Sequence, residues 1–134
     1  MATTQVEQDN VAQVRRGFDA FGAGDMPALA ELYAPNATWH GPTMGVIAGD
    51  SIGRDAIFKT FEQLARETSG TFRASPSAFA AAGDRVFVQL IATGQRKGKS
   101  LDSNDVLVFT VTDGKVTNVR LYVSDVQGNL DFWS

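Results

Sequence analysis

The sequence predicts a single α+β domain in which helices come first and a curved antiparallel sheet follows. Two observations predict this class: apolar residues recur at helical spacing in the first half, and from Thr71 onward they alternate with a period of two. The length of 134 residues fits one compact domain, and no Pro/Gly/Ser-rich linker or repeat divides residues 1–134.

Three segments have the spacing of amphipathic helices. The first runs from about residue 5 to the break at Gly22–Gly24. The second begins at Asp25, a candidate N-cap, has Leu29, Leu32 and Tyr33 on its apolar face, and is expected to stop at Pro35. The third spans residues 54–67. Together they provide one helical layer for the sheet.

Five segments are expected to be extended. A short strand over residues 37–41 follows the second helix, and a Gly-rich loop that contains Met44, a pocket flap or an ordinary connector, leads to the third helix. Four longer runs make an antiparallel meander over residues 72–82, 85–95, 101–112 and 115–123. Asp113-Gly114 indicates a tight hairpin, whereas Pro76 indicates a bulged or edge strand. Phe132 and Trp133 add packing near the C-terminus.

Both faces of the predicted sheet carry large apolar side chains. Val86, Val88 and Leu90 alternate with Phe87 and Ile91. Three helices can cover only one face, the concave one, so the second face needs another cover. A homodimer packed sheet to sheet is the simplest expectation.

Composition excludes several classes of function. Fifteen acidic against twelve basic residues give a net charge of -3, which does not favour nucleic acid as a partner. The chain has no Cys and a single His, so we expect no metal site and no cofactor built on these ligands. The polar segment of residues 1–10 and the lack of a long apolar run predict a cytoplasmic protein without a membrane partner.

The order and spacing of several segments resemble the nuclear transport factor 2-like superfamily, in particular its SnoaL-like polyketide cyclase and ketosteroid isomerase members. The resemblance rests on Phe18 and Phe21, the run 24–37, Trp39, the helix start 53–57, the strand and turn 108–116, and Arg120-Leu121-Tyr122. It implies a cone-shaped α+β barrel with a deep apolar pocket. Members use such pockets for isomerisation, aldol cyclisation, epoxide hydrolysis, dehydration or binding alone, so the fold does not define the reaction.

The resemblance also implies a catalytic carboxylate just after the Tyr of the last strand, as Tyr-x-Asp. This chain reads Tyr122-Val123-Ser124-Asp125, so a strict register places Ser124 at that position. Asp125 takes the role only if the strand end turns it inward. Independently, the alternation of Val119, Leu121 and Val123 places Asp125 on the apolar side if the strand continues. The alternative is that Asp125 caps a C-terminal turn.

A second carboxylate follows from the same periodicity. Asp105 shares its face with Leu107, Phe109 and Val111, so its side chain is expected to enter the same apolar space. Two carboxylates on adjacent strands are a common arrangement for acid/base chemistry, because burial raises the pKa of one of them.

Two further side chains are candidates for catalysis. His40, at the end of the first strand, is either a base at the pocket mouth or a solvated strand-end residue. Tyr33 is either a hydrogen-bond donor to an oxyanion or a core residue. The expected walls of the pocket are Trp39, Phe58, Phe61, Phe109 and Met44.

Three functions follow. The first is an enzyme of the isomerase, cyclase or lyase kind, which moves a proton next to a carbonyl group of an apolar small molecule without a cofactor. The second is a binding module that holds a lipophilic molecule and moves no proton. The third is a dimerising interaction protein whose pocket is filled by side chains such as Phe58 and Met44.

Overall fold

The structure, a computed structural model, describes residues 4–134 and places four helices and six strands within them. In chain order the elements are α1 (Gln5–Ala23), α2 (Met26–Leu32), β1 (Tyr33–His40), β2 (Ser51–Ile52), α3 (Arg54–Glu67), β3 (Arg73–Ala82), β4 (Arg85–Arg96), β5 (Lys99–Thr112), β6 (Lys115–Val123) and α4 (Val126–Trp133). The predicted α+β class is confirmed, and so are the four long strands.

The strands form one sheet in the order β2-β1-β6-β5-β4-β3. The last four make the expected antiparallel meander, and Asp113 and Gly114, both with positive φ, form the tight turn between β5 and β6. Pro76 lies on the edge strand β3 beside a register shift, where a residue without an N–H group is tolerated. The sequence predicted a purely antiparallel sheet, and this is wrong: β1 pairs with β6 in parallel, so the sheet is mixed.

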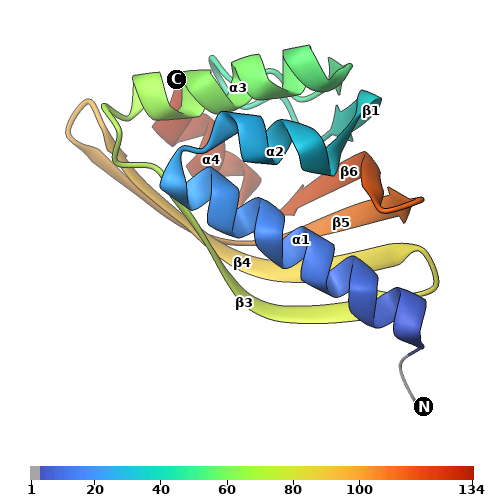
Figure 1. The fold of residues 1–134 in the computed structure, drawn as a ribbon. Coiled ribbons are helices and arrows are strands. Elements are labelled where there is room, and N and C mark those ends of the chain that lie inside the picture. The colour runs from blue at the N-terminus through green and yellow to red at the C-terminus, as the bar shows by residue number, and fades with distance from the viewer. Residues whose placement is uncertain (1–3) are drawn as a thin grey trace.

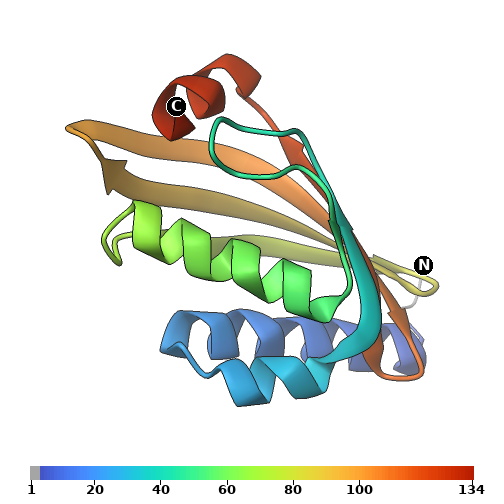
Figure 2. The ribbon, with the colours of Figure 1, turned by 90° about the horizontal axis from the view of Figure 1, so that it is seen from above.

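All four helices lie on the concave side of this sheet (Figure 1). α1 packs on β3 and beside α2, and α3 packs over β1. Viewed from above, α4 lies at one end of the helical layer, beside the loop that joins β1 to β2 (Figure 2). α4 packs on β5, close to the hairpin that joins β4 to β5 (Figure 2).

The helix boundaries follow from local chemistry. Thr4 and Glu7 form a reciprocal capping box at the start of α1, and Gly24 ends that helix in the left-handed conformation. Asp25 caps α2 as predicted, since its carboxylate accepts the Ala28 N–H at 3.2 Å. No helix within residues 4–134 has the length and hydropathy needed to cross a membrane.

Two boundaries differ from the sequence prediction. α2 ends at Leu32, and Tyr33 already begins β1, so Tyr33 is not part of the apolar face of a helix. Pro35 lies inside β1 and does not stop a helix. The strand accommodates it because the pairing of β1 with β6 is interrupted between Tyr33 and Thr38.

The loop between β1 and β2 is packed against both α3 and α4. Met44 and Ile47 are buried and pair with each other through two backbone hydrogen bonds of 2.9 Å. The Val46 N–H donates to the Trp133 carbonyl at 3.0 Å, and the Gln63 side chain donates to the Val46 carbonyl at 2.8 Å. These contacts favour the connector over the mobile flap.

Candidate active site

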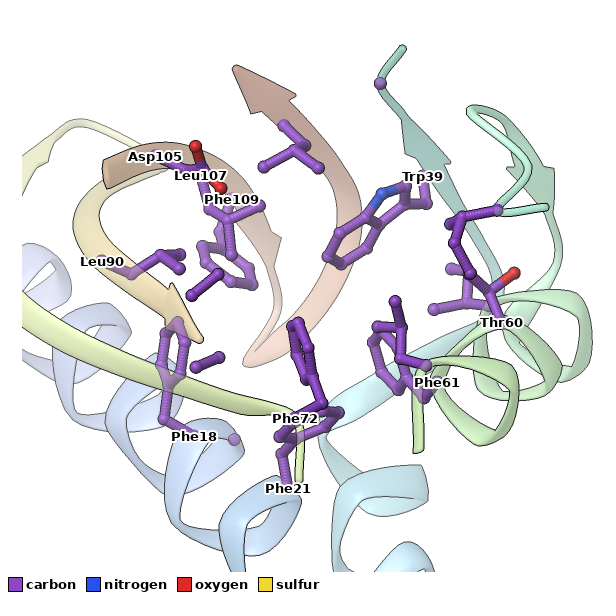
Figure 3. Close-up of a pocket in the computed structure, with 18 of the residues that line it drawn as sticks. Phe18, Phe21, Trp39, Thr60, Phe61, Phe72, Leu90, Asp105, Leu107 and Phe109 are labelled. Carbon is purple, nitrogen blue, oxygen red and sulfur yellow. The ribbon is translucent and has the colours of Figure 1, made fainter. Parts of the chain in front are cut away.

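A cavity of about 120 Å³ lies between the concave face of the sheet and the helices. Figure 3 shows Phe18, Phe21 and Phe72 on one side of it, Trp39, Thr60 and Phe61 on a second, and Leu90, Asp105, Leu107 and Phe109 on a third. Because an apolar cavity of roughly 150 Å³ holds a benzene-sized molecule, the volume of this cavity limits a fully enclosed ligand to about one small ring.

Phe61 of α3 is the centre of an aromatic wall. Its ring centroid lies 5.2 Å from that of Phe21 and 5.5 Å from that of Trp39, both edge to face, and 5.8 Å from the stacked ring of Phe58. Such pairs contribute roughly 0.5 to 1.5 kcal/mol beyond their buried area. The wall therefore has a defined shape without a ligand.

Four of the five predicted wall residues line the cavity: Trp39, Phe61, Phe109 and Met44. Phe58 does not line it; its half-buried ring packs on Tyr33 and Phe61 from behind. The interaction-protein hypothesis requires a pocket that side chains such as Phe58 and Met44 fill. Space remains between the lining side chains, so the cavity does not meet this requirement.

Asp105 is the carboxylate of this cavity. Alternation along β5 turns it to the concave face, opposite Leu90 on β4, and only 5% of its surface is exposed. Among the described residues that line the cavity, Asp105 and Tyr33 are the only titratable ones. The position predicted from the period-two pattern is confirmed.

Burial in apolar surroundings raises the pKa of Asp105, and hydrogen bonds from Ser103 and Ser124 partly oppose this rise. The Ser103 hydroxyl donates to Oδ1 at 2.6 Å, and the Ser124 N–H donates to the same oxygen at 3.3 Å. Within residues 4–134, no hydrogen bond reaches Oδ2. One oxygen is therefore held by the protein, and the other is open to a ligand.

Asn129 completes this polar group from α4. It is buried, lines the cavity, and donates through Nδ2 to the Ser103 hydroxyl at 3.1 Å and to the Asp125 carbonyl at 2.9 Å. Neither Ser103 nor Asn129 was predicted from the sequence as a site residue. Ser103 shares the parity of Asp105 and was detectable on that ground, whereas Asn129 depends on a helix that the pattern did not predict.

The expectation that Asp125 faces the cavity is wrong. Asp125 is exposed and caps α4, where its carboxylate accepts the Gly128 N–H at 2.9 Å. The alternation of β6 does not extend to it, because the strand ends at Val123 and the chain turns into the helix. Ser124 is exposed too, but its backbone N–H reaches Asp105.

His40 lies outside the cavity lining. Trp39 points inward, so its neighbour His40 points to the opposite face of β1, where its side chain is 29% exposed. Its Nδ1 atom is 3.3 Å from the exposed carboxylate of Asp50. This position matches the strand-end alternative.

Tyr33 lines the cavity but is remote from Asp105. On β6, Tyr33 pairs with Val116 and Asp105 with Val123, seven residues further along the strand (123 − 116). Seven residues correspond to about 23 Å of strand length along β6, so the two side chains belong to opposite ends of the cavity lining. Burial raises the pKa of Tyr33, so the phenol stays protonated among Phe58 and Phe61. The two predicted catalytic groups are not brought together.

Within residues 4–134, no group of three or more His, Asp or Glu side chains is arranged to hold a metal ion.

A curved sheet and four helices thus enclose a small pocket with one buried carboxylate in a cone-like α+β fold. The model of the SnoaL-like domain family matches residues 14–119, and the chain belongs to this family. The solved structure of Bal32a, from a soil-derived mobile gene cassette, is 39% identical with a TM-score of 0.93, over 97% of this chain and 100% of that one.

Two more relatives agree with this placement. A nuclear transport factor 2-like protein from Burkholderia xenovorans is 30% identical with a TM-score of 0.81, over 96% of this chain and 98% of that one. An uncharacterized protein of Mycobacterium tuberculosis is 27% identical over 90% of this chain and 93% of its own length. The recognised superfamily and the cone-like fold are thereby confirmed.

Proposed function

We propose that the protein binds a small, largely apolar carbonyl compound in the cavity and that Asp105 moves a proton at a carbon next to the carbonyl group. The observation that carries this proposal is a carboxylate that is 5% exposed, lines a largely apolar cavity and has one oxygen, Oδ2, without a hydrogen bond from the described residues. A raised pKa brings a carboxylate closer to the pH at which it exchanges protons efficiently.

The step is the same for isomerase, cyclase and lyase chemistry up to the enolate. The ionised Asp105 takes a proton from the carbon, the electron pair of that C–H bond forms a C=C bond to the carbonyl carbon, and the π pair of the carbonyl group moves onto its oxygen. In an isomerisation of a β,γ-unsaturated ketone, the protonated Asp105 then returns the proton to the γ carbon, and the double bond becomes conjugated. The carboxylate is regenerated, so no cofactor is needed for the balance of the reaction.

The enolate oxygen needs a hydrogen-bond donor, and we assign this role to the indole N–H of Trp39. Asp105 and Trp39 lie on opposite sides of the cavity in Figure 3. No described residue accepts a hydrogen bond from Trp39 in this structure. The Tyr33 hydroxyl, the donor expected from the sequence, lies too far along the sheet.

The test uses a β,γ-unsaturated cyclohexenone, whose single ring matches the cavity volume. Conversion to the conjugated isomer is followed by ultraviolet absorbance, and NMR in D₂O reports deuterium incorporation. The variant Asp105→Asn is expected to lose about a hundredfold to ten-thousandfold in kcat/KM, because it keeps the shape but cannot accept the proton.

Asp102→Asn is the matched control. Asp102 lies on the same strand but on the opposite face and is exposed, so its substitution is expected to leave turnover unchanged. Full turnover by Asp105→Asn would remove Asp105 from the mechanism, and equal losses in both variants would show that the effect is not specific to the cavity.

The predominantly apolar wall also favours the second function, a binding module without catalysis. In that case cyclohexenone quenches or shifts the fluorescence of the two cavity tryptophans, Trp39 and Trp133, when it binds, but there is no conversion and no deuterium exchange. Binding by Asp105→Asn is then as strong as binding by the wild type. Proton exchange that depends on Asp105 excludes this alternative.

A further inference from the structure

We propose that Ser103 and Asn129 are positioning residues: the chain of hydrogen bonds from Asn129 through Ser103 to Asp105 reserves Oδ1 as an acceptor and leaves Oδ2 as the atom that exchanges the proton. The inference rests on the proposed function in so far as a proton is transferred. The arrangement of the three side chains can be tested without turnover.

The direction of the hydrogen bonds follows from the atoms present. The Nδ2 group of Asn129 lies 2.9 Å from the Asp125 carbonyl, which can only accept, so the amide nitrogen must be on this side. The second hydrogen of the same group points to the Ser103 oxygen at 3.1 Å. Both hydrogens of the Asn129 amide are therefore used.

Ser103 has one hydroxyl hydrogen, and it accepts from Asn129. Its own hydrogen therefore goes to Asp105 Oδ1, at 2.6 Å. The Ser124 N–H also points to Oδ1, at 3.3 Å. A proton placed on Oδ1 would displace both donors, so the proton from a ligand is accommodated on Oδ2.

α4 holds this chain of hydrogen bonds in place. Asn129 and Ser103 are each 3% exposed. The buried guanidinium of Arg96 donates to the Phe132 carbonyl at 3.1 Å and to the Ser134 carbonyl, and it pairs with Glu67 at 2.9 Å. These contacts fasten the C-terminal end of α4 to β4 and α3, so the donor to Ser103 comes from a fixed element.

Few charged groups surround the three residues. From α4, the Asp125 carboxylate faces the exposed N-terminus of the helix and is bonded to the Gly128 N–H. The inward positions of β4 and β6 next to Asp105, Leu90 and Val123, are apolar. A change in the titration of Asp105 after substitution of Ser103 therefore reports on the hydroxyl itself.

The direct test is ¹³C NMR titration of the Asp105 carboxyl group in the ligand-free protein. In Ser103→Ala the titration midpoint is expected at higher pH than in the wild type, because the hydrogen bond that favours the ionised form is gone. Ser103→Thr keeps a hydroxyl and is expected to restore the wild-type midpoint. Ser100→Ala, the same change at an exposed position of β5, is expected to leave it unchanged.

Asn129→Leu tests the outer member of the chain. It leaves the Ser103 hydroxyl in place but removes the donor that orients it, so the midpoint is expected to shift in the same direction and by less. A shift in Ser103→Ala larger than that in Asn129→Leu supports the order of the chain. The reverse order overturns it.

Turnover gives the second measurement. Ser103 does not line the cavity, so Ser103→Ala is expected to change KM little. The variant is expected to lower kcat about tenfold to a hundredfold. The acidic limb of its pH profile is expected to move to higher pH. A purely structural role would lower the melting temperature without moving that limb.

The outcomes separate the two proposals. An unchanged carboxyl titration in a folded Ser103→Ala variant overturns the positioning role, whether or not the enzyme is active. A shifted titration with no conversion by the wild-type protein sustains the positioning role and sinks the proposed reaction. If Ser103→Ala does not fold, Ser103→Cys, a weaker donor, takes its place and is expected to give a smaller shift in the same direction.

Discussion

The two faces of β5 differ in solvent exposure, even where they carry residues of the same type. Asp105 on the concave face is 5% exposed, and burial raises its pKa, whereas Asp102 on the convex face is exposed to solvent. Leu107 is 6% exposed and its neighbour Val106 is 37% exposed. The parity of a position along the strand, and not its residue type, decides whether a carboxylate becomes a candidate for catalysis.

The largest effect is expected from a pair of substitutions that compares these faces. Leu107→Ala removes a buried side chain and is expected to lower the free energy of unfolding by about 2 to 5 kcal/mol. Val106→Ala, the adjacent residue, is expected to cost less than about 1 kcal/mol, since this side chain is partly solvated already. Urea denaturation of the two variants measures the difference.

Equal costs for the two substitutions would contradict the comparison. They would mean that Val106 is as well covered in solution as Leu107, and thus that another surface packs on the convex face. Measuring the Val106→Ala variant over a range of protein concentrations separates cover by a second copy from cover within the chain.

The convex face raises the question of the partner predicted from the sequence. Phe87 and Ile91 of β4, Val106 of β5 and Tyr122 of β6 are all exposed there, between 37% and 56%. Val106 pairs with Tyr122 on β6 and with Gln89 on β4, and Phe87 and Ile91 flank Gln89 on the same face of β4. The sheet-to-sheet homodimer stays a prediction that this face supports.

The next largest effect is expected from Ile91→Arg, which places a charge on the convex face and tests the homodimer. At the centre of a sheet-to-sheet interface, an unpaired charge is costly, so the variant is expected to have the mass of a monomer when the wild type has that of a dimer. Analytical ultracentrifugation measures the mass. Gln8→Arg, which adds the same charge on the exposed side of α1, is the control. A wild-type protein that is monomeric at micromolar concentration excludes the dimer.

Periodicity predicted the four long strands and the inward position of Asp105 correctly, because both depend on alternation within strands that are long enough to show it. β4 and β5 have 12 and 14 residues, and the buried positions recur at every second residue over most of their length. The same reasoning failed for Asp125, because it extended the alternation of β6 two residues beyond the strand end.

The other misses have a common physical cause, which is that they depend on contacts between distant segments. α4 has only eight residues and is held by Arg96 and Val46, so its own pattern is too short to predict it. The parallel pairing of β1 with β6 joins strands that are far apart in sequence. Asn129 was missed because its role requires both features of the C-terminal segment, the helix and its contact with β5.

The smallest effect concerns the free energy of unfolding after substitution of the two carboxylates, Asp105 and Asp125, that were candidates from the sequence. Because the pKa of Asp105 is raised in the folded state, its favourable contribution is complete below the ordinary pKa of Asp and is lost as pH rises through the folded value. Asp105→Asn, which stays neutral, is therefore expected to be more stable than the wild type at pH 7. The difference should vanish near pH 3 to 4.

Asp125→Asn is the matched substitution on the outside. Asn is about as good an N-cap as Asp, so it can keep the bond to the Gly128 N–H, and the stability is expected to match the wild type within about 0.5 kcal/mol at neutral pH. Thermal melts from pH 3 to 8 compare both variants with the wild type.

A destabilised Asp105→Asn at pH 7 would mean that the ionised carboxylate is better solvated in the cavity than its burial indicates. The open Oδ2 atom would then contact water and not apolar side chains, and the case for proton transfer at that atom would weaken with it.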